Sequence, residues 1–103
     1  MKLYKWNPET DGPLSETALT NKLEKLGYHC TCYTYSKGTV FPDHSHGADK
    51  IDAVLKGQFR ISTSGESVIM EPGDYVFVPA NTTHHAEVIG DESVVSIDAI
   101  KLD

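Results

Sequence analysis

The sequence predicts an all-β domain, a jelly-roll barrel of two sheets, with one α-helix near the N-terminus. Two observations lead to this prediction. After residue 27, short runs rich in Val, Ile, Thr and aromatic residues alternate with turns that contain Gly, Pro or Asn. The number of such runs, about eight, is the strand count of a jelly roll. Only one stretch, before residue 28, has the apolar period of an amphipathic helix.

The predicted helix covers residues 16–26. Ser15 is a favourable N-cap, and Gly27 can supply the residue that ends the helix. Three leucines recur at positions i, i+4 and i+7, so they form one apolar stripe that packs on a sheet edge or on an open barrel end. These leucines are Leu19, Leu23 and Leu26.

Strands are predicted wherever β-branched and aromatic residues lie between turn sequences such as Lys56-Gly57 or Ser64-Gly65. The segment Met1–Trp6 is a further candidate, an edge strand that pairs either within the chain or across the two-fold axis of a homodimer. The predicted strands are 28–36, 39–41, 50–56, 58–63, 66–70, 75–78, 83–89 and 93–100.

Length and composition exclude several classes of protein. The 103 residues make one domain, with an N-terminal segment 1–27 and a barrel 28–103. Nine basic against 15 acidic residues give a net charge of −6, which argues against nucleic acid or an anionic membrane as partner. No apolar run is long enough to span a bilayer, and the first residues lack a secretory signal. Cys30 and Cys32 are expected to be reduced thiols, so we expect a cytoplasmic protein.

Three of the five histidines have a spacing that suggests a metal site. His44 and His46 are two residues apart, so on an extended chain their imidazoles project the same way. His84 comes 38 residues after His46, at the start of another predicted strand. Neutral imidazole is a ligand for zinc, iron, copper and nickel, and three imidazoles leave coordination positions open.

Two segments carry a family resemblance. Residues 38–57 follow the pattern Gly38-x5-His44-x-His46-x3-Lys50-x6-Gly57, and residues 73–84 follow Gly73-x5-Pro79-x-Asn81-x2-His84. In this order and spacing they resemble the two motifs of the cupin superfamily, in particular its small, single-domain, RmlC-like members.

The resemblance implies a fold, a cofactor and ligands for it. The fold is the cupin double-stranded β-helix, a jelly-roll barrel. The cofactor is a divalent transition metal held inside the barrel by His44, His46 and His84. Relatives use iron, manganese, zinc, nickel or copper, so the resemblance does not choose among them.

Three positions depart from the cupin pattern. Asn81 replaces a glycine, a mild change because asparagine tolerates positive φ. Val88 replaces an asparagine and removes a polar group from the barrel lining. Lys50 stands where the family usually has a glutamate as fourth ligand, and a protonated lysine cannot bind a metal.

Lys50 and Asp52 share a strand face and are therefore predicted to share the cavity. Asp52 could replace the glutamate as ligand, or a bulge near residues 47–48 could turn Asp49 inward. In the arrangement that we favour, Lys50 pairs with Asp52 and leaves a three-histidine metal. A register slip would instead point Lys50 to solvent. An inward Lys50 would suit a substrate carboxylate or enolate oxygen.

The resemblance implies three functional hypotheses. The first is a dioxygenase-type enzyme that acts on a small anionic molecule, with Asp52 available to orient Lys50 or move a proton. The second is a module that binds or senses a metal or small molecule without catalysis. The third is a sugar isomerase or epimerase, for which Tyr75, His85 and Lys50 are the available acid–base residues. A metal held by imidazoles should leave as the pH falls through about 6.

Overall fold

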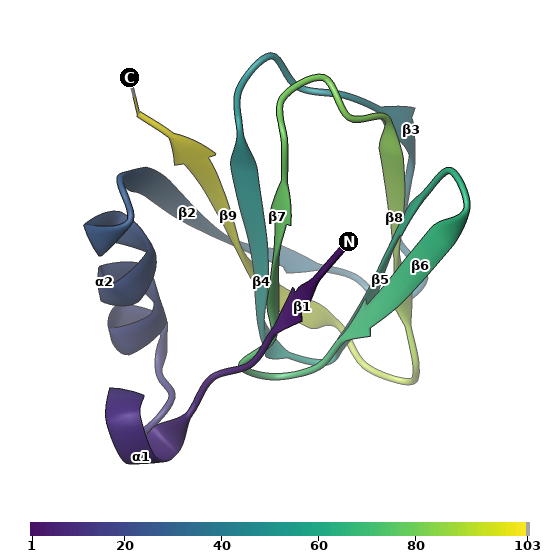
Figure 1. Ribbon diagram of the computed structural model, residues 1–103. Helices are drawn as coiled ribbons and strands as arrows, with labels where there is room; N and C mark the ends of the chain where they lie inside the picture. Colours follow the sequence, from purple (N-terminus) through teal and green to yellow (C-terminus); the bar gives the residue numbers. More distant parts are fainter. Residues whose placement is uncertain (103) are drawn as a thin grey trace.

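The computed structural model describes residues 1–102, which form two antiparallel sheets that enclose a barrel (Figure 1). Asp103, the last residue of the predicted barrel segment 28–103, lies outside the described residues. One sheet has five strands in the order β1-β7-β4-β9-β2, and the other has four in the order β3-β8-β5-β6. Strands that are distant in sequence therefore pair, as expected for a jelly roll. The all-β prediction is confirmed.

The predicted strands agree with the observed ones to within one residue at each end, with one exception. The predicted strand 39–41 continues to His44. The elements in chain order are β1 (Leu3–Tyr4), α1 (Pro8–Asp11), α2 (Glu16–Lys25), β2 (Tyr28–Tyr35), β3 (Val40–His44), β4 (Lys50–Lys56), β5 (Gln58–Thr63), β6 (Glu66–Met70), β7 (Tyr75–Val78), β8 (His84–Ile89) and β9 (Val94–Lys101).

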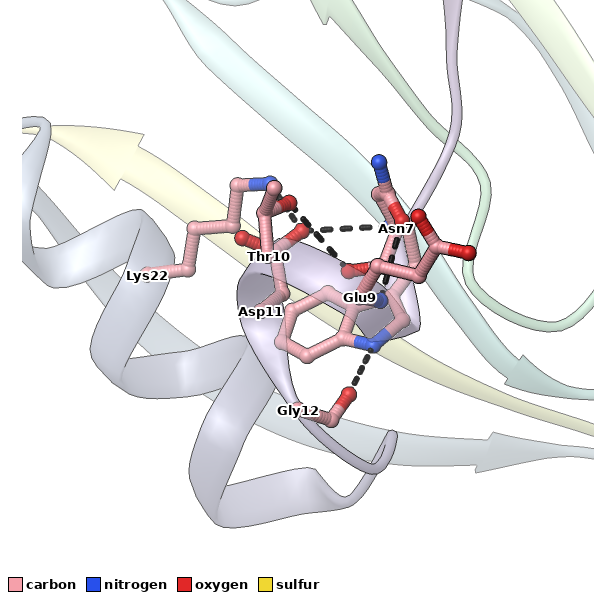
Figure 2. Close-up of polar contacts among 7 residues, drawn as sticks. Asn7, Glu9, Thr10, Asp11, Gly12 and Lys22 are labelled. Atoms are coloured by element: carbon pink, nitrogen blue, oxygen red, sulfur yellow. Dashed lines mark hydrogen bonds and ion pairs between the residues drawn. The ribbon is translucent and has the colours of Figure 1, made fainter.

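Helix α1 was not predicted, because four residues are too few to show a helical period. Its end signals are nevertheless clear (Figure 2). The side chain of Asn7 accepts a hydrogen bond of 3.0 Å from the backbone N–H of Glu9, and Pro8 occupies the first turn. Lys22 Nζ lies 2.8 Å from Oδ2 of Asp11, so an ion pair joins α1 to α2.

Helix α2 begins where predicted but buries only two leucines of the stripe. Ser15 caps it by accepting a hydrogen bond of 3.0 Å from the backbone N–H of Ala18. Leu19 and Leu23 are completely buried. The prediction is wrong for Leu26, which is 45% exposed, because the helix ends there and the chain turns away.

Helix α2 covers the outer face of the five-stranded sheet (Figure 1). Ile51 and Ala53 of β4 pack in the same buried cluster as the helix leucines. Because side chains alternate along a strand, their neighbours Lys50 and Asp52 point to the inside of the barrel. Asp98 of β9 faces inward for the same reason, between Ile97 and Ala99 of the helix-facing cluster.

A second apolar cluster fills the space between the two sheets. It draws side chains from both sheets and includes Val88, the residue that replaces the asparagine of the cupin pattern. Its fully or nearly buried members are Val54, Phe59, Ile61, Met70, Val76, Val78, Ala86, Val88 and Val94.

The N-terminal segment pairs within the chain. Strand β1 lies antiparallel to β7 at the edge of the five-stranded sheet, with Leu3 opposite Val76 and Tyr4 opposite Tyr75. The intramolecular pairing is therefore present in this chain, and the homodimer stays a prediction. Within residues 1–102, no helix has the length and apolar character needed to cross a membrane.

We predict that Leu23→Ala lowers the free energy of unfolding by about 2–5 kcal/mol, because it opens a cavity between α2 and the sheet. Leu26→Ala removes the same atoms from an exposed side chain of the same helix and should cost about 0.5 kcal/mol or less. Urea denaturation of both variants measures the difference. Equal losses would contradict this account of the packing.

Candidate functional site

Three histidines meet at one end of the barrel. His44 is the last residue of β3 and His84 the first of β8, and the two lie directly opposite each other in the ladder. His46 follows in the loop after β3. The ring centroids are 4.3 Å apart for His44 and His84, 4.9 Å for His44 and His46, and 5.5 Å for His46 and His84. One ring nitrogen of each lies within 4.8 Å of the others, so the three could hold one ion.

The backbone fixes which ring nitrogen is available in two of these histidines. Nδ1 of His44 lies 2.7 Å from the carbonyl oxygen of Pro42, and Nδ1 of His84 lies 2.8 Å from that of Thr82. A carbonyl oxygen only accepts, so Nδ1 must carry the proton and donate it. The lone pair of Nε2 is then free to bind a metal, as is usual for histidine ligands. The donor set therefore fits a divalent transition metal.

The surroundings favour the neutral form of two of the imidazoles. Burial lowers the pKa of His84, and the hydrogen bond to Thr82 opposes that change only in part. Burial, followed by the positive charge of Lys50, lowers the pKa of His46. Both rings are therefore neutral at pH 7, and a metal would not have to displace protons from them.

The histidines line a cavity of about 150 Å³ whose two walls differ in character. His44 and His84 come from the four-stranded sheet, while the five-stranded sheet contributes a charged wall of Lys50, Asp52 and Asp98. Cavities of this volume in other proteins hold a ligand of about the size of benzene. The remaining lining residues are His46, Tyr35, Phe41, Phe59 and Ala86.

Lys50 faces the cavity, as predicted, but its partner is a different aspartate. Its side chain is 13% exposed, and Nζ lies 2.6 Å from Oδ1 of Asp98 on β9. The predicted pair with Asp52 is therefore wrong. The physical reason is that Asp52 lies in the part of the wall where ionisation is costly, so Asp98 is the better partner for a cation.

Asp52 and Asp98 lie directly opposite each other on β4 and β9. Burial, followed by the Asp98 carboxylate, raises the pKa of Asp52 to about 7. Two carboxyl groups on facing positions of a ladder do not readily ionise together, so the pair holds one proton below about pH 7. Lys50 compensates the one remaining negative charge.

The structure does not bring the two carboxylates of the other arrangements, Asp49 and Asp52, into the histidine cluster. Oδ1 of Asp49 accepts a hydrogen bond of 2.7 Å from the backbone N–H of Ala80, which holds it at the turn before β8 rather than in the cavity. Asp52 does not belong to the cluster of potential metal-binding residues found in residues 1–102, which contains the three histidines alone.

The turn after β7 supports the histidine loop. Asn81 adopts a positive φ of 63°, as expected where the cupin pattern has glycine. Its backbone N–H donates a hydrogen bond of 2.7 Å to the carbonyl oxygen of His46. This contact joins the loop that carries His46 to the turn that precedes His84.

Two residues considered for isomerase chemistry do not reach the cavity. Tyr75 packs beneath helix α2, in the cluster on the outer face of the sheet. The side chain of His85 is 43% exposed and lies 3.3 Å from Asp43. Of the three acid–base residues considered for that hypothesis, only Lys50 lines the cavity.

Sequence reasoning missed Asp98 and Tyr35, both of which line the cavity. A signal for Asp98 was present, since it is the only charged residue between Val94 and Ile100 in a mostly apolar strand. Tyr35 had no such signal. Burial, followed by the carboxylates of Asp98 and Asp52, raises the pKa of its hydroxyl, which therefore stays protonated.

Comparisons with known proteins agree with this fold. The family described as Cupin domain matches residues 32–100. KdgF from Halomonas sp. is 27% identical, with 75% of this chain and 71% of that chain covered and a TM-score of 0.63. A cupin-like protein from Thermotoga maritima is 24% identical, with 80% and 62% covered and a TM-score of 0.65, and shows the fold alone. A search of curated proteins found no match.

His84→Ala should abolish stoichiometric metal binding, because it removes the most deeply buried of the three imidazoles. His85→Ala is the matched control, since this neighbouring histidine points away from the cavity and should leave the metal content unchanged. Elemental analysis of both purified variants makes the comparison. Undiminished metal in His84→Ala would show that the cluster is not the metal site.

The raised pKa of Asp52 predicts how the stability of the metal-free protein depends on pH. The folded state holds a proton that the unfolded chain releases above about pH 4. The stability that this proton contributes is complete below that pH and is lost as the pH rises through about 7. Asp52→Asn cannot ionise, so its stability relative to the unsubstituted protein should increase over this range.

The expected relative gain is about 1–4 kcal/mol, since one pKa unit corresponds to about 1.4 kcal/mol. Urea denaturation at pH 5 and pH 8 measures it. Asp91→Asn, which alters an exposed carboxylate, controls for the loss of a charge. If the stability of Asp52→Asn relative to the unsubstituted protein does not vary with pH, the raised pKa of Asp52 is contradicted.

Proposed function

The chain belongs to the cupin family, and on this premise we propose that it binds a divalent transition metal through His44, His46 and His84 and acts on a small anionic molecule as a dioxygenase-type enzyme. The observation that carries the proposal is that three imidazoles line the same small cavity as a lysine whose side chain is only 13% exposed. Iron(II) bound by three imidazoles would leave positions open for a chelating molecule and dioxygen, and would supply the redox chemistry.

The histidine side of the cavity is preorganised for this role. The hydrogen bonds from Nδ1 of His44 and His84 to backbone carbonyls hold each ring in one orientation and one tautomer. The hydrogen bond from the backbone N–H of Asn81 to the carbonyl oxygen of His46 fixes the loop that carries His46. The chain thus supplies three imidazole nitrogen donors without having to rearrange its backbone.

Aromatic side chains supply the apolar part of the cavity. Tyr35 and Phe41 pack edge to face, with ring centroids 4.8 Å apart, and Phe59 lies 5.6 Å from Tyr35. These rings would contact the carbon skeleton of a substrate and exclude water from the reacting end. Because the cavity holds only a small ligand, the substrate is expected to be a compact molecule.

Lys50 is the residue proposed to orient the substrate. Its ammonium group is almost removed from solvent, and in such surroundings a cation stabilises a negative oxygen more strongly than in water. A small molecule that reaches both the histidines and Lys50 would be held at its two ends, with its oxyanion at Lys50. The Asp98 carboxylate, 2.6 Å from Lys50 Nζ, holds the ammonium group in place.

Oxygen uptake tests the proposal. The protein is reconstituted with iron(II) under anaerobic conditions, and small diketones, phenols and thiols are then added in an oxygen electrode. At least one of these compounds should cause oxygen consumption that His84→Ala abolishes and His85→Ala preserves. Failure to bind iron would contradict the proposal. A rise in Tm with a compound, without oxygen consumption, would instead favour a non-catalytic binding module.

Lys50→Gln should raise the KM for an active compound about tenfold, because it removes one charge-assisted contact worth about 1.5 kcal/mol or more. The metal content should not change, since Lys50 is not a ligand. Lys56→Gln, in the same strand but exposed, is the control. An unchanged KM in Lys50→Gln would mean that Lys50 does not contact the substrate.

A further inference from the structure

Strand β2 is the last strand of the five-stranded sheet, and within residues 1–102 it pairs with β9 alone. The pairing runs without a bulge over all eight residues, from Tyr28 to Tyr35. Five of these eight side chains are exposed. The outer side of β2 is therefore a long, regular strand edge that a further strand could extend.

The hydrogen-bond pattern shows which backbone groups point to this outer side. The N–H of Leu102 donates a hydrogen bond of 2.9 Å to the carbonyl oxygen of Gly27, directly before the first β2–β9 pair. In an antiparallel ladder, residues that bond to the partner strand alternate with residues that do not. Every second residue of β2 therefore directs its N–H and C=O away from β9. These residues are Tyr28, Cys30, Cys32 and Thr34.

Strand β2 also lacks the residues that usually protect an edge. Natural edge strands carry lysine or other charged side chains, proline or a bulge, which discourage pairing with another strand. The eight residues of β2 include no Lys, Arg, Asp, Glu or Pro, although 23% of the chain is charged. The edge is thus suited to the addition of a strand from a partner.

Helix α2 places acidic side chains along this edge. Sγ of Cys30 lies 4.0 Å from the carbonyl oxygen of Thr20, so this face of the helix lies over β2. Glu16 and Glu24 lie one turn before and one turn after Thr20, so they share its face, and both are exposed. Burial, followed by the Glu24 carboxylate, raises the pKa of the Cys30 thiol. Burial, followed by the Glu16 carboxylate, raises the pKa of the Cys32 thiol.

The opposite face of β2 carries an exposed aromatic ring. Tyr33 is 44% exposed and stacks on Tyr35, with ring centroids 6.0 Å apart. Because side chains alternate along a strand, Tyr33 lies on the inner face of the sheet with Tyr35, while Cys30 and Cys32 lie on the helix face. A strand added beside β2 would meet carboxylates on one face and a tyrosine ring on the other.

We propose that the outer edge of β2 binds an extended segment of a partner protein in which basic side chains alternate with apolar ones. The backbone of the segment pairs with the outward N–H and C=O groups of β2. Its basic side chains face Glu16 and Glu24, and its apolar side chains face Tyr33. The site uses neither the histidines nor the cavity, so it goes beyond the proposed function.

A second copy of this chain fits the edge less well. Pairing β2 with itself about a two-fold axis would bring the two α2 helices side by side on one face of a continuous sheet. The helices would run antiparallel, so Glu16 of one copy would approach Glu24 of the other. Like charges repel, and the net charge of −6 on each chain adds to the repulsion. A basic segment makes contacts with the same carboxylates attractive.

Fluorescence polarisation with labelled peptides tests this inference. The probe is a short peptide of alternating lysine and valine, titrated with the protein at low ionic strength under reducing conditions. One comparison peptide has glutamate in place of lysine, and another has the same composition with all lysines first. The alternating lysine peptide should bind at least about tenfold more tightly than either. Its affinity should fall at high salt, because the carboxylates of α2 are exposed.

Two kinds of variant separate the charge from the backbone contribution. Glu16→Gln combined with Glu24→Gln should weaken binding of the lysine peptide about tenfold, whereas Glu9→Gln, on α1, should not. Cys32→Pro should weaken it by at least as much, because proline removes an N–H at the outer edge that β9 does not use. Cys32→Ser keeps that N–H and is the matched control, with an unchanged affinity.

Hydrogen exchange, read residue by residue, locates the bound peptide on the unsubstituted protein. Without peptide, the amides of Cys32 and Thr34 should exchange fast, and those of Thr31 and Tyr33 slowly, since only the latter bond to β9. The lysine peptide should slow exchange at Cys32 and Thr34 at least about tenfold.

Three results would overturn the inference. The first is absence of binding by the lysine peptide, or equal binding by the glutamate peptide. The second is unchanged exchange at Cys32 and Thr34 with the peptide bound. The third is a dimer, seen by sedimentation, that slows exchange at these amides without peptide, because a second copy would then occupy the edge. If Cys32→Pro fails to fold, hydrogen exchange of the unsubstituted protein decides. His84→Ala should bind the peptide normally, so failure of the metal proposal would leave this test unaffected.

Discussion

The packing of helix α2 against the outer face of the five-stranded sheet determines which side chains reach the cavity. Ile51 and Ala53 are held against the helix, so strand alternation directs Lys50 and Asp52 to the inside of the barrel. A shift of one residue in the register of β4 would turn Lys50 and Asp52 toward the leucines of helix α2. Both side chains would then be lost from the cavity wall. The helix is thus part of the site, although none of its residues lines it.

The second constraint is electrostatic. A largely buried lysine side chain close to a cation site would repel the metal if its charge were not compensated. Here Lys50 lies on one sheet while His44 and His84 lie on the other, and the Asp98 carboxylate, 2.6 Å from Lys50 Nζ, compensates the lysine charge. The protonated Asp52 adds a hydrogen-bond donor without adding charge. This arrangement lets the three metal-binding histidines and the ammonium group of Lys50 line one small cavity.

Most of the fold could be predicted from the sequence because its signals are local. Strand alternation and turn residues gave the strand limits, and two of the three stripe leucines are buried as predicted. The meeting of the three histidines followed from the motif resemblance. The Lys50–Asp98 pair could not be predicted, because it depends on how β4 and β9 align although residues 57–93 separate these strands in the chain. Local spacing favoured Asp52, which is nearer in sequence but poorer as an ionised partner.

The central claim is that three imidazoles bind the metal and that no carboxylate replaces the usual glutamate. X-ray absorption spectroscopy of the zinc-loaded protein tests it most directly, because imidazole and carboxylate ligands give different scattering. The account predicts three imidazole nitrogens at about 2.0–2.1 Å, and the same spectrum for Asp52→Asn and Asp98→Asn. A carboxylate oxygen in the coordination shell that either substitution removes would contradict it, as would a shell with fewer than three imidazoles.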